Sequence, residues 1–127
     1  MKKVISTTNA PQAVGPYSQG IFVNKTLYVS GQIPFNPHTN SLVSDSIEDQ
    51  TLQCLNNILG IVEEAGMKKE NIIRCGVFMT NLSDFSKMNQ IYEKFFGNHK
   101  PVRAAVEVNR LPKAVLIEID AIAVMDE

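Results

Sequence analysis

The 127-residue sequence has only two cysteines, and it lacks a long apolar run. Two cysteines cannot supply the disulfide framework of a small secreted protein, and Cys54 and Cys75 each fall in an apolar segment. We therefore expect both thiols to be reduced and buried. The polar start, Met1 to Ser6, lacks the apolar region of a signal peptide, and no later segment reaches a membrane-spanning length. These absences predict a cytoplasmic protein with no membrane partner.

A basic stripe is also missing, because Lys and Arg are dispersed along a chain of net charge −1. Such a surface does not attract a polyanion by charge alone, so nucleic acid is a disfavoured partner. There is no glycine-rich phosphate loop, and neither His38 nor His99 has a Cys or an acid at metal-ligand spacing. We assign no metal site and expect no cofactor.

The length and organisation of the sequence predict one domain over residues 1–127, since no repeat or linker divides the chain. Hydrophobic periodicity and turn signals predict an α+β fold in the order ββαβαββ, with both helices covering one face of a mixed sheet. The Asn24-Lys25 turn predicts a hairpin between the first two strands. Expected elements are strands at 20–23, 26–32 and 72–82, a helix between Ser46 and Gly66, and a helix between Ser83 and Gly97.

The segment from Pro101 to Ala123 is the most informative, because it sets four charged residues into two otherwise apolar strands. Side chains alternate along a strand, and a turn at Pro112 would fold the two strands into a hairpin. One face of this predicted hairpin is apolar and the other is mixed. The mixed face would carry Arg103, Glu107, Glu118 and Asp120.

Arg103 is the first candidate for ligand binding, because a guanidinium held on a strand is a rigid fork for a carboxylate. The alternative, which the residues alone favour, is a structural ion pair with Glu107 or Asp120. Glu118 is the second candidate, since a partly desolvated carboxylate can hold a water or move protons. In a hairpin, Arg103 would lie roughly 13 Å from Glu118 along the strand. The two would then act at opposite ends of a small ligand or meet across an interface.

The sheet face that the helices leave uncovered should hold apolar side chains beside these charges. A monomer rarely exposes so much apolar surface, so we predict an oligomer. The expected apolar residues are Tyr28, Phe78, Leu116, Ile122 and Val124.

Three weaker signals accompany the charged strands. Tyr17 lies in a rigid turn, either as a ligand contact or as a packed loop aromatic. Ser30-Gly31 is either a place where a ligand approaches the backbone or a simple strand exit. Asn89, in the second predicted helix, either reaches inward as a donor or faces water.

Together these motifs resemble the RidA (YjgF) family of reactive-intermediate deaminases, which also carries the name endoribonuclease L-PSP. The similarity runs nearly end to end, and the resemblance implies a chorismate-mutase-like fold. It further implies a homotrimer whose sheets form a central barrel, with sites in the clefts between subunits. The segments that carry it include Asn9-Ala10-Pro11, residues 15–19, residues 30–34, Val106-Glu107-Val108 and Leu111-Pro112-Lys113.

The resemblance also implies a reaction, the hydrolysis of 2-imino acids to 2-keto acids and ammonia without a cofactor. The substrates would be 2-iminopropanoate and 2-iminobutanoate, the tautomers of 2-aminoacrylate and 2-aminocrotonate. By motif position, Arg103 would hold the substrate carboxylate and Glu118 would position the attacking water. The residues implied to line the pocket are Tyr17, Ser30, Gly31 and Asn89.

One position departs from the family pattern, because many members have Cys or Thr where this chain has Ala105. This excludes a thiol role and leaves the main-chain N–H and C=O of residue 105 for binding substrate or water. The family's older name suggests an alternative function, namely a ribonuclease that acts on single-stranded RNA and thereby inhibits translation. A non-catalytic trimer that binds 2-keto acids is a third possibility.

Overall fold

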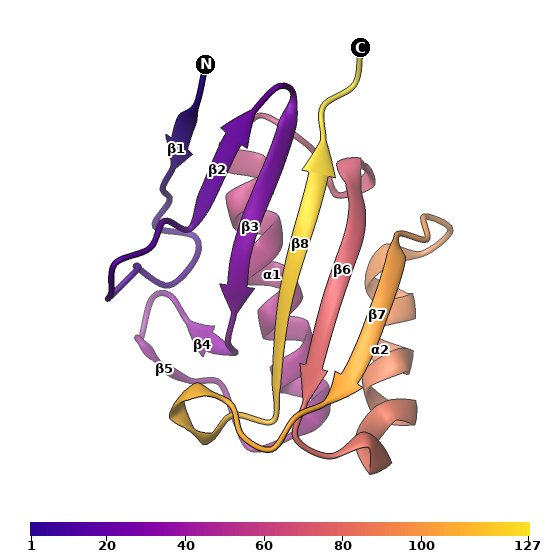
Figure 1. The fold of residues 1–127 in the computed structure, drawn as a ribbon. Coiled ribbons are helices and arrows are strands. Elements are labelled where there is room, and N and C mark those ends of the chain that lie inside the picture. The colour runs from indigo at the N-terminus through magenta and orange to yellow at the C-terminus, as the bar shows by residue number, and fades with distance from the viewer.

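The computed structural model describes residues 1–127 and contains a six-stranded mixed sheet with the strand order β1-β2-β3-β8-β6-β7 (Figure 1). A short ribbon of β4 (Phe35–Asn36) and β5 (Ser41–Leu42) stands apart from it. The main strands are β1 (Lys3–Ile5), β2 (Gly20–Val23), β3 (Thr26–Gln32), β6 (Ile72–Met79), β7 (Val102–Glu107) and β8 (Ile117–Val124), and the helices are α1 (Ile47–Glu64) and α2 (Phe85–Phe96). The predicted α+β class is confirmed.

Local signals in the sequence place several of these boundaries. Asn24 and Lys25 have φ angles of 51° and 62°, which are the left-handed conformations of a tight turn that matches the twist of β2 and β3. The Ser46 side chain accepts a hydrogen bond from the Asp49 N–H at 3.1 Å and so caps α1. At the end of α2, Gly97 has a φ of 64°, a conformation that glycine adopts without strain. The predicted hairpin and both helices are confirmed. The strand expected at 72–82 ends earlier, at Met79, and α2 begins at Phe85 because a short 3₁₀ turn, Leu82–Asp84, comes before it.

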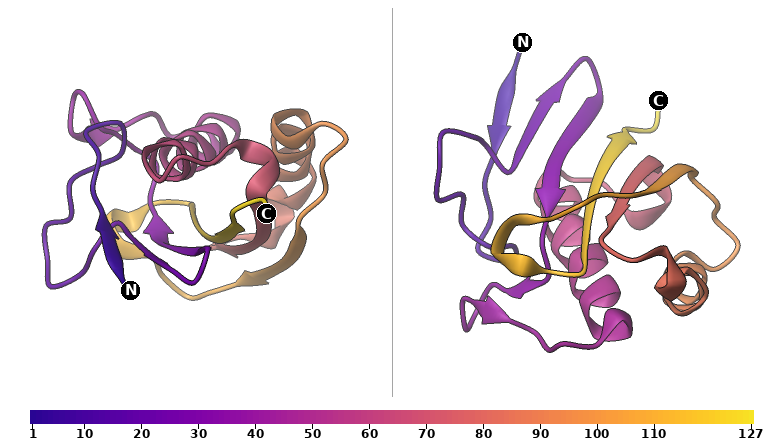
Figure 2. Two further views of the ribbon diagram at one scale, coloured as in Figure 1. Left: turned by 90° about the horizontal axis from the view of Figure 1, so that it is seen from above. Right: turned by 60° about the horizontal axis from the view of Figure 1, so that its bottom comes forward.

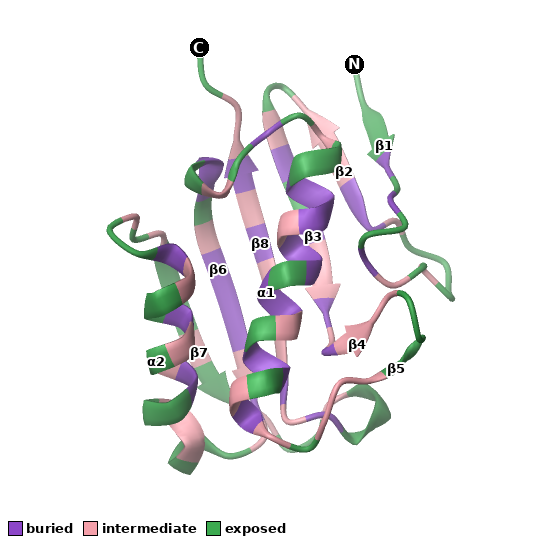
Figure 3. Cartoon of the chain, turned by 180° about the vertical axis from the view of Figure 1, so that it is seen from behind, coloured by how far each residue is buried: buried purple, intermediate pink, exposed green.

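Both helices lie on one side of the sheet, as predicted (Figure 2). Helix α1 packs against β3 and β8, and α2 packs beside α1. The buried side of α1 faces the sheet in Figure 3. Each fully buried Leu or Ile side chain contributes about 1.5–3 kcal/mol. The centre of this core includes Leu55, Ile58, Ile61, Val77, Ile117 and Ile119. Neither helix is both long and apolar enough to cross a bilayer.

The predicted hairpin between β7 and β8 is wrong. Strand β7 lies at the edge of the sheet, parallel to β6, whereas β8 lies between β3 and β6. The core face of β8 is entirely apolar, so this strand can occupy the centre. The corresponding face of β7 carries Arg103 and Glu107, charges that only an edge strand can keep in contact with water.

This arrangement separates the four charges that were predicted to share one face. Arg103 lies in register with the buried Cys75 and therefore projects to the helix-covered side. Glu118 lies in register with Phe78, on the uncovered side. Asp120 is on the same side as Glu118, two residues along β8. The charges predicted to share one mixed face therefore lie on opposite sides of the sheet, with Arg103 on the helix-covered side and Glu118 and Asp120 on the uncovered side.

The uncovered side carries the apolar surface that was expected there. Tyr28, Val4 and Val106 are 50%, 57% and 44% exposed, and the strand register places Phe78, Ile122 and Val124 with them. Leu116 is an exception, since it precedes β8 and packs partly against the core.

Candidate functional site

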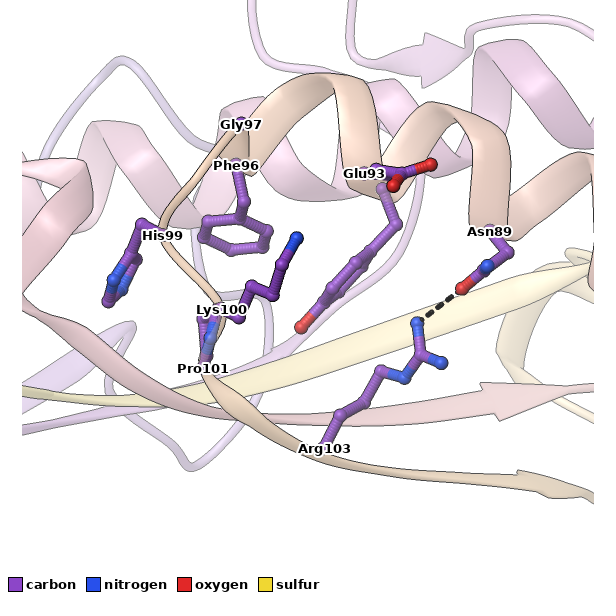
Figure 4. A pocket seen from close by; sticks show the side chains of 9 residues that line it. Asn89, Glu93, Phe96, Gly97, His99, Lys100, Pro101 and Arg103 are labelled. Atoms are coloured by element: carbon purple, nitrogen blue, oxygen red, sulfur yellow. Dashed lines mark hydrogen bonds between the residues drawn. The ribbon is translucent and has the colours of Figure 1, made fainter.

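The first group of candidate residues, which we call the arginine half-site, consists of Arg103 and the α2 residues that touch it. Arg103 Nη1 donates a hydrogen bond to Asn89 Oδ1 at 2.7 Å, as Figure 4 shows. The guanidinium carbon also lies 4.8 Å from the ring centre of Tyr92 and 5.4 Å from that of Phe85. Both distances are within the range of a cation–π interaction. Helix α2 thus orients Arg103 with an amide and two aromatic rings.

Arg103 has no carboxylate partner, so the ion-pair alternatives do not apply. Asp120 pairs instead with Arg74, at 3.3 Å between Oδ1 and Nη1. Glu107 accepts a hydrogen bond from the Leu82 N–H at 2.8 Å. A guanidinium has five N–H donors, and the bond to Asn89 occupies one of them. The remaining donors can receive a carboxylate in the bidentate geometry that arginine favours.

A cavity of about 340 Å³ opens beside Arg103, between α2 and the loop that precedes β7 (Figure 4). Its volume is in the range of small-molecule sites. Lys100 adds a second cation to the lining and Glu93 adds an acid. The residues around it include Asn89, Tyr92, Phe96, His99, Pro101 and Arg103.

The second group, which we call the glutamate half-site, consists of Tyr17, Ser30, Gly31 and Glu118. A bulge between Val29 and Gln32 interrupts the pairing of β3 with β8 at Ser30 and Gly31. A Cβ atom at Gly31 would clash with the Glu118 carboxylate. The Glu118 carboxylate therefore lies directly over the β3 backbone, in space that only glycine at position 31 leaves free for it.

The Tyr17 turn joins this half-site through hydrogen bonds from Ser30. The Ser30 hydroxyl donates to the Ser18 carbonyl at 2.5 Å, and its N–H donates to the Gln19 carbonyl at 2.9 Å. Tyr17 and Gly31 both line a cavity of about 220 Å³, to which Lys113 contributes a cation. Three of the predicted pocket residues are thus brought to the side of Glu118.

Electrostatics differ between the two acids of β8. Asp120 accepts hydrogen bonds from Arg74 and, at 3.0 Å, from the Gly76 N–H. Glu118 has no ion-pair partner. Partial burial, followed by the nearby negative charge of Asp120, raises the pKa of the Glu118 carboxyl. The pKa of Glu118 is thereby moved toward neutral pH, a direction that favours proton transfer.

The remaining predicted positions are Ala105 and the two cysteines. Ala105 lies on the helix-covered side of β7 and packs against the core. Because β7 is an edge strand, one side of its main chain has no strand neighbour. Cys54 and Cys75 are free and buried, as predicted. Burial raises the pKa of Cys54 and raises that of Cys75 to about 11, so neither is a ready nucleophile.

The sequence pattern did not single out Phe85 and Tyr92 as neighbours of Arg103. Together with Asn89 they occur at i, i+4 and i+7, the spacing that places side chains on one helix face. This signal could have been found, but it is also the spacing of ordinary core residues. Only the packing of α2 over β7 distinguishes the two.

Comparison with known proteins shows the family to which the chain belongs. The sequence profile described as endoribonuclease L-PSP matches residues 7–125. The chain belongs to this family. The resemblance to RidA and YjgF proteins is thereby confirmed. Two family relatives and one solved structure illustrate the range of names.

A RutC family protein of Pyrococcus horikoshii is 51% identical over 123 residues, covering 97% of this chain and 98% of that protein. The Escherichia coli 2-iminobutanoate/2-iminopropanoate deaminase is 48% identical over 127 residues and 98% of each chain is covered. The crystal structure of E. coli TdcF with bound serine superposes with a TM-score of 0.94 at 42% identity, covering 98% of this chain and 99% of that one. Imine deaminases are thus among the relatives that share this chain's full length.

Proposed function

We propose that this protein hydrolyses reactive 2-imino acids, such as 2-iminobutanoate and 2-iminopropanoate, to 2-keto acids and ammonia. The observation that carries the proposal is the pair of half-sites. One holds an arginine free of any carboxylate partner, and the other holds a glutamate with a raised pKa. The reaction needs a clamp for the carboxylate and a group that handles protons of water. The deaminase name of a 48% identical relative supports the same conclusion.

In the proposed reaction, Arg103 binds the substrate carboxylate, so that the carbon atom of the protonated imine faces Glu118. Glu118 takes a proton from water as the water oxygen attacks that carbon, which forms a tetrahedral amino alcohol. That proton then passes to the amino nitrogen, and Glu118 takes the hydroxyl proton as the C=O bond forms, the C–N bond breaks and ammonia leaves. The released ammonia takes up this second proton as ammonium, which returns Glu118 to its carboxylate form. Tyr17, Asn89 and the main chain of residue 105 complete the lining of the pocket. No cofactor is required, because the protonated imine is already electrophilic.

Arg103 and Glu118 of one chain cannot hold the same small substrate. They project from opposite sides of the sheet, and their strands are separated by β6, a distance of about 10 Å at ordinary strand spacing. A complete site therefore requires the arginine half-site of one copy and the glutamate half-site of another. We infer a homotrimer in which the uncovered faces form a central barrel and bury their exposed apolar residues.

The test of this proposal uses imines generated in situ by a threonine dehydratase, with keto-acid formation as the readout. The wild type should accelerate keto-acid release, whereas Arg103→Ala and Glu118→Gln should each be nearly inactive. Absence of acceleration by the wild type would refute the deaminase proposal.

Mixing the two inactive variants tests the shared site. In randomly mixed closed assemblies, about a quarter of the interfaces would pair an intact Arg103 with an intact Glu118. Activity should return to about that fraction after co-refolding or co-expression. No recovery, in mixed assemblies whose composition is verified by native mass spectrometry, would place both groups within one chain.

A ribonuclease is the second candidate, because the family description names an endoribonuclease. Incubating the wild type and Arg103→Ala with single-stranded RNA would detect this activity and its dependence on the same site. Binding of 2-oxobutanoate without turnover would instead support a keto-acid-binding regulatory trimer. The cytoplasmic location stays a prediction from the sequence.

A further inference from the structure

We propose that Tyr92, assisted by Phe85, is a positioning residue whose ring holds the Arg103 guanidinium ready for a carboxylate without neutralising it. This inference rests on the proposed function, because it assumes that Arg103 is the carboxylate clamp. Neither aromatic residue was among the site residues that the family resemblance implied.

The geometry of α2 provides a preformed surface for Arg103. Phe85, Asn89 and Tyr92 lie on one face of the helix, and Arg103 approaches all three from β7. Tyr92 is only 7% exposed, and its ring packs against Phe96 with the centroids 4.8 Å apart. Its hydroxyl is enclosed and lies near the buried thiol of Cys75, a weak partner, without a well-formed hydrogen bond. The Tyr92 ring is therefore a rigid support for a side chain that is itself exposed.

The chemistry of the support is as important as its rigidity. A carboxylate would also orient Arg103, but it would occupy the N–H donors and cancel the charge that a ligand must meet. An aromatic face attracts the cation through its quadrupole and adds no negative charge. The side-chain amide oxygen of Asn89, Oδ1, likewise orients one N–H of Arg103 without carrying a charge. The three contacts thus fix Arg103 and keep it cationic toward substrate.

The hydroxyl of Tyr92 does not explain why a tyrosine occupies this buried position. Burying a hydroxyl without a strong partner is costly, and phenylalanine would fill the same apolar space. The ring is the part that contacts Arg103. We therefore expect the ring, and not the hydroxyl, to govern carboxylate binding.

The experiment compares Tyr92→Leu, Tyr92→Phe and a matched control, Phe95→Leu. Phe95 is on the same helix and makes a cation–π contact of its own, with Lys69 at 4.0 Å, whereas the rings in cation–π contact with Arg103 are those of Phe85 and Tyr92. Two readouts are used, namely 2-oxobutanoate binding by calorimetry and the kinetics of imine hydrolysis.

Tyr92→Leu should raise both Kd and KM by roughly three- to thirtyfold, the range expected for losing one cation–π contact. The value of kcat should fall less, because Arg103 holds the substrate and does not react. Tyr92→Phe should restore KM to within about threefold of the wild type. Phe85→Leu, at a half-buried position, should also raise KM but by a smaller factor, because this ring lies farther from the Arg103 guanidinium than the Tyr92 ring does. Phe95→Leu should change the melting temperature without moving KM.

Several results would overturn the inference. One is a KM for Tyr92→Leu equal to that of Phe95→Leu. Another is an increase in KM for Tyr92→Phe as large as the increase for Tyr92→Leu. If Tyr92→Leu does not fold, an unchanged KM in Phe85→Leu overturns it as well. Wild type that binds 2-oxobutanoate but does not turn over imines would refute the deaminase and leave the positioning role measurable by Kd. A wild-type protein that neither binds 2-oxobutanoate nor turns over imines would refute both the deaminase proposal and the positioning role of Tyr92.

Discussion

The arginine and glutamate half-sites hold their charges in opposite ways. On the helix-covered side, Arg103 is surrounded by an amide and two rings, none of which carries a charge. On the uncovered side, Glu118 lies over the bare backbone of Gly31 and two residues from a second acid, Asp120. The first environment keeps a cation available for a ligand. The second moves a carboxyl toward its protonated form, which suits proton transfer.

The largest expected effect comes from removing the proton-handling group. Glu118→Gln keeps the shape of the side chain but cannot accept a proton, so kcat should fall by about 10²- to 10⁴-fold. KM should change little, since carboxylate binding belongs to the other half-site. Dehydratase-coupled kinetics measure both constants, and an unchanged kcat would remove Glu118 from the mechanism.

Arg103→Ala should lower kcat/KM by about a hundred- to a thousandfold, the lower part of the range for two lost charge-assisted hydrogen bonds, because the arginine side chain is exposed. Most of the loss should appear in KM, in contrast to the effect of Glu118→Gln. The kcat/KM of Arg103→Lys should lie between those of the wild type and the alanine variant, because an ammonium group keeps the charge but lacks the two parallel N–H donors of a guanidinium. Equal KM values for all three proteins would contradict the clamp.

A smaller loss should follow from displacing Glu118 without altering it. In Gly31→Ala the new Cβ would push the carboxylate away from its position over β3. We expect kcat to fall roughly ten- to a hundredfold, as for other small misplacements of a reacting group. Gly15→Ala is the control, because its Cβ would meet only the Tyr17 ring at an ordinary contact distance of 3.5 Å. If both variants retain full activity, the close approach of Glu118 to Gly31 has no catalytic role.

The smallest effect should be a shift of the pH profile in Asp120→Asn. As a base, Glu118 is active when deprotonated, so kcat/KM should decline as the pH falls through its pKa. The negative charge of Asp120 raises this pKa, and removing the charge should therefore move the acidic limb to lower pH. Glu63→Gln, an exposed change on α1, serves as the control. A limb that stays in place would show that burial alone sets the pKa of Glu118.

Much of the local structure follows from short sequence patterns. The Asn24-Lys25 turn, the Ser46 cap and Gly97 are boundaries whose causes lie within a few residues. The alternation of β8 correctly predicted which of its side chains enter the core. The pairing of β7 could not be obtained in this way, because it depends on which strand has a face apolar enough for the centre of the sheet.

For the site, the sequence by itself determined the residue types and their faces along each strand. The family motifs are sufficient to name Arg103, Glu118, Gly31 and Asn89 as candidates. Tertiary structure alone decided that Arg103 and Glu118 project to opposite sides of one sheet and that two rings of α2 support the arginine. The physical reason is that alternation specifies a side chain's face only relative to its own strand. Strand order and helix packing, which depend on contacts distant in sequence, decide what each face meets.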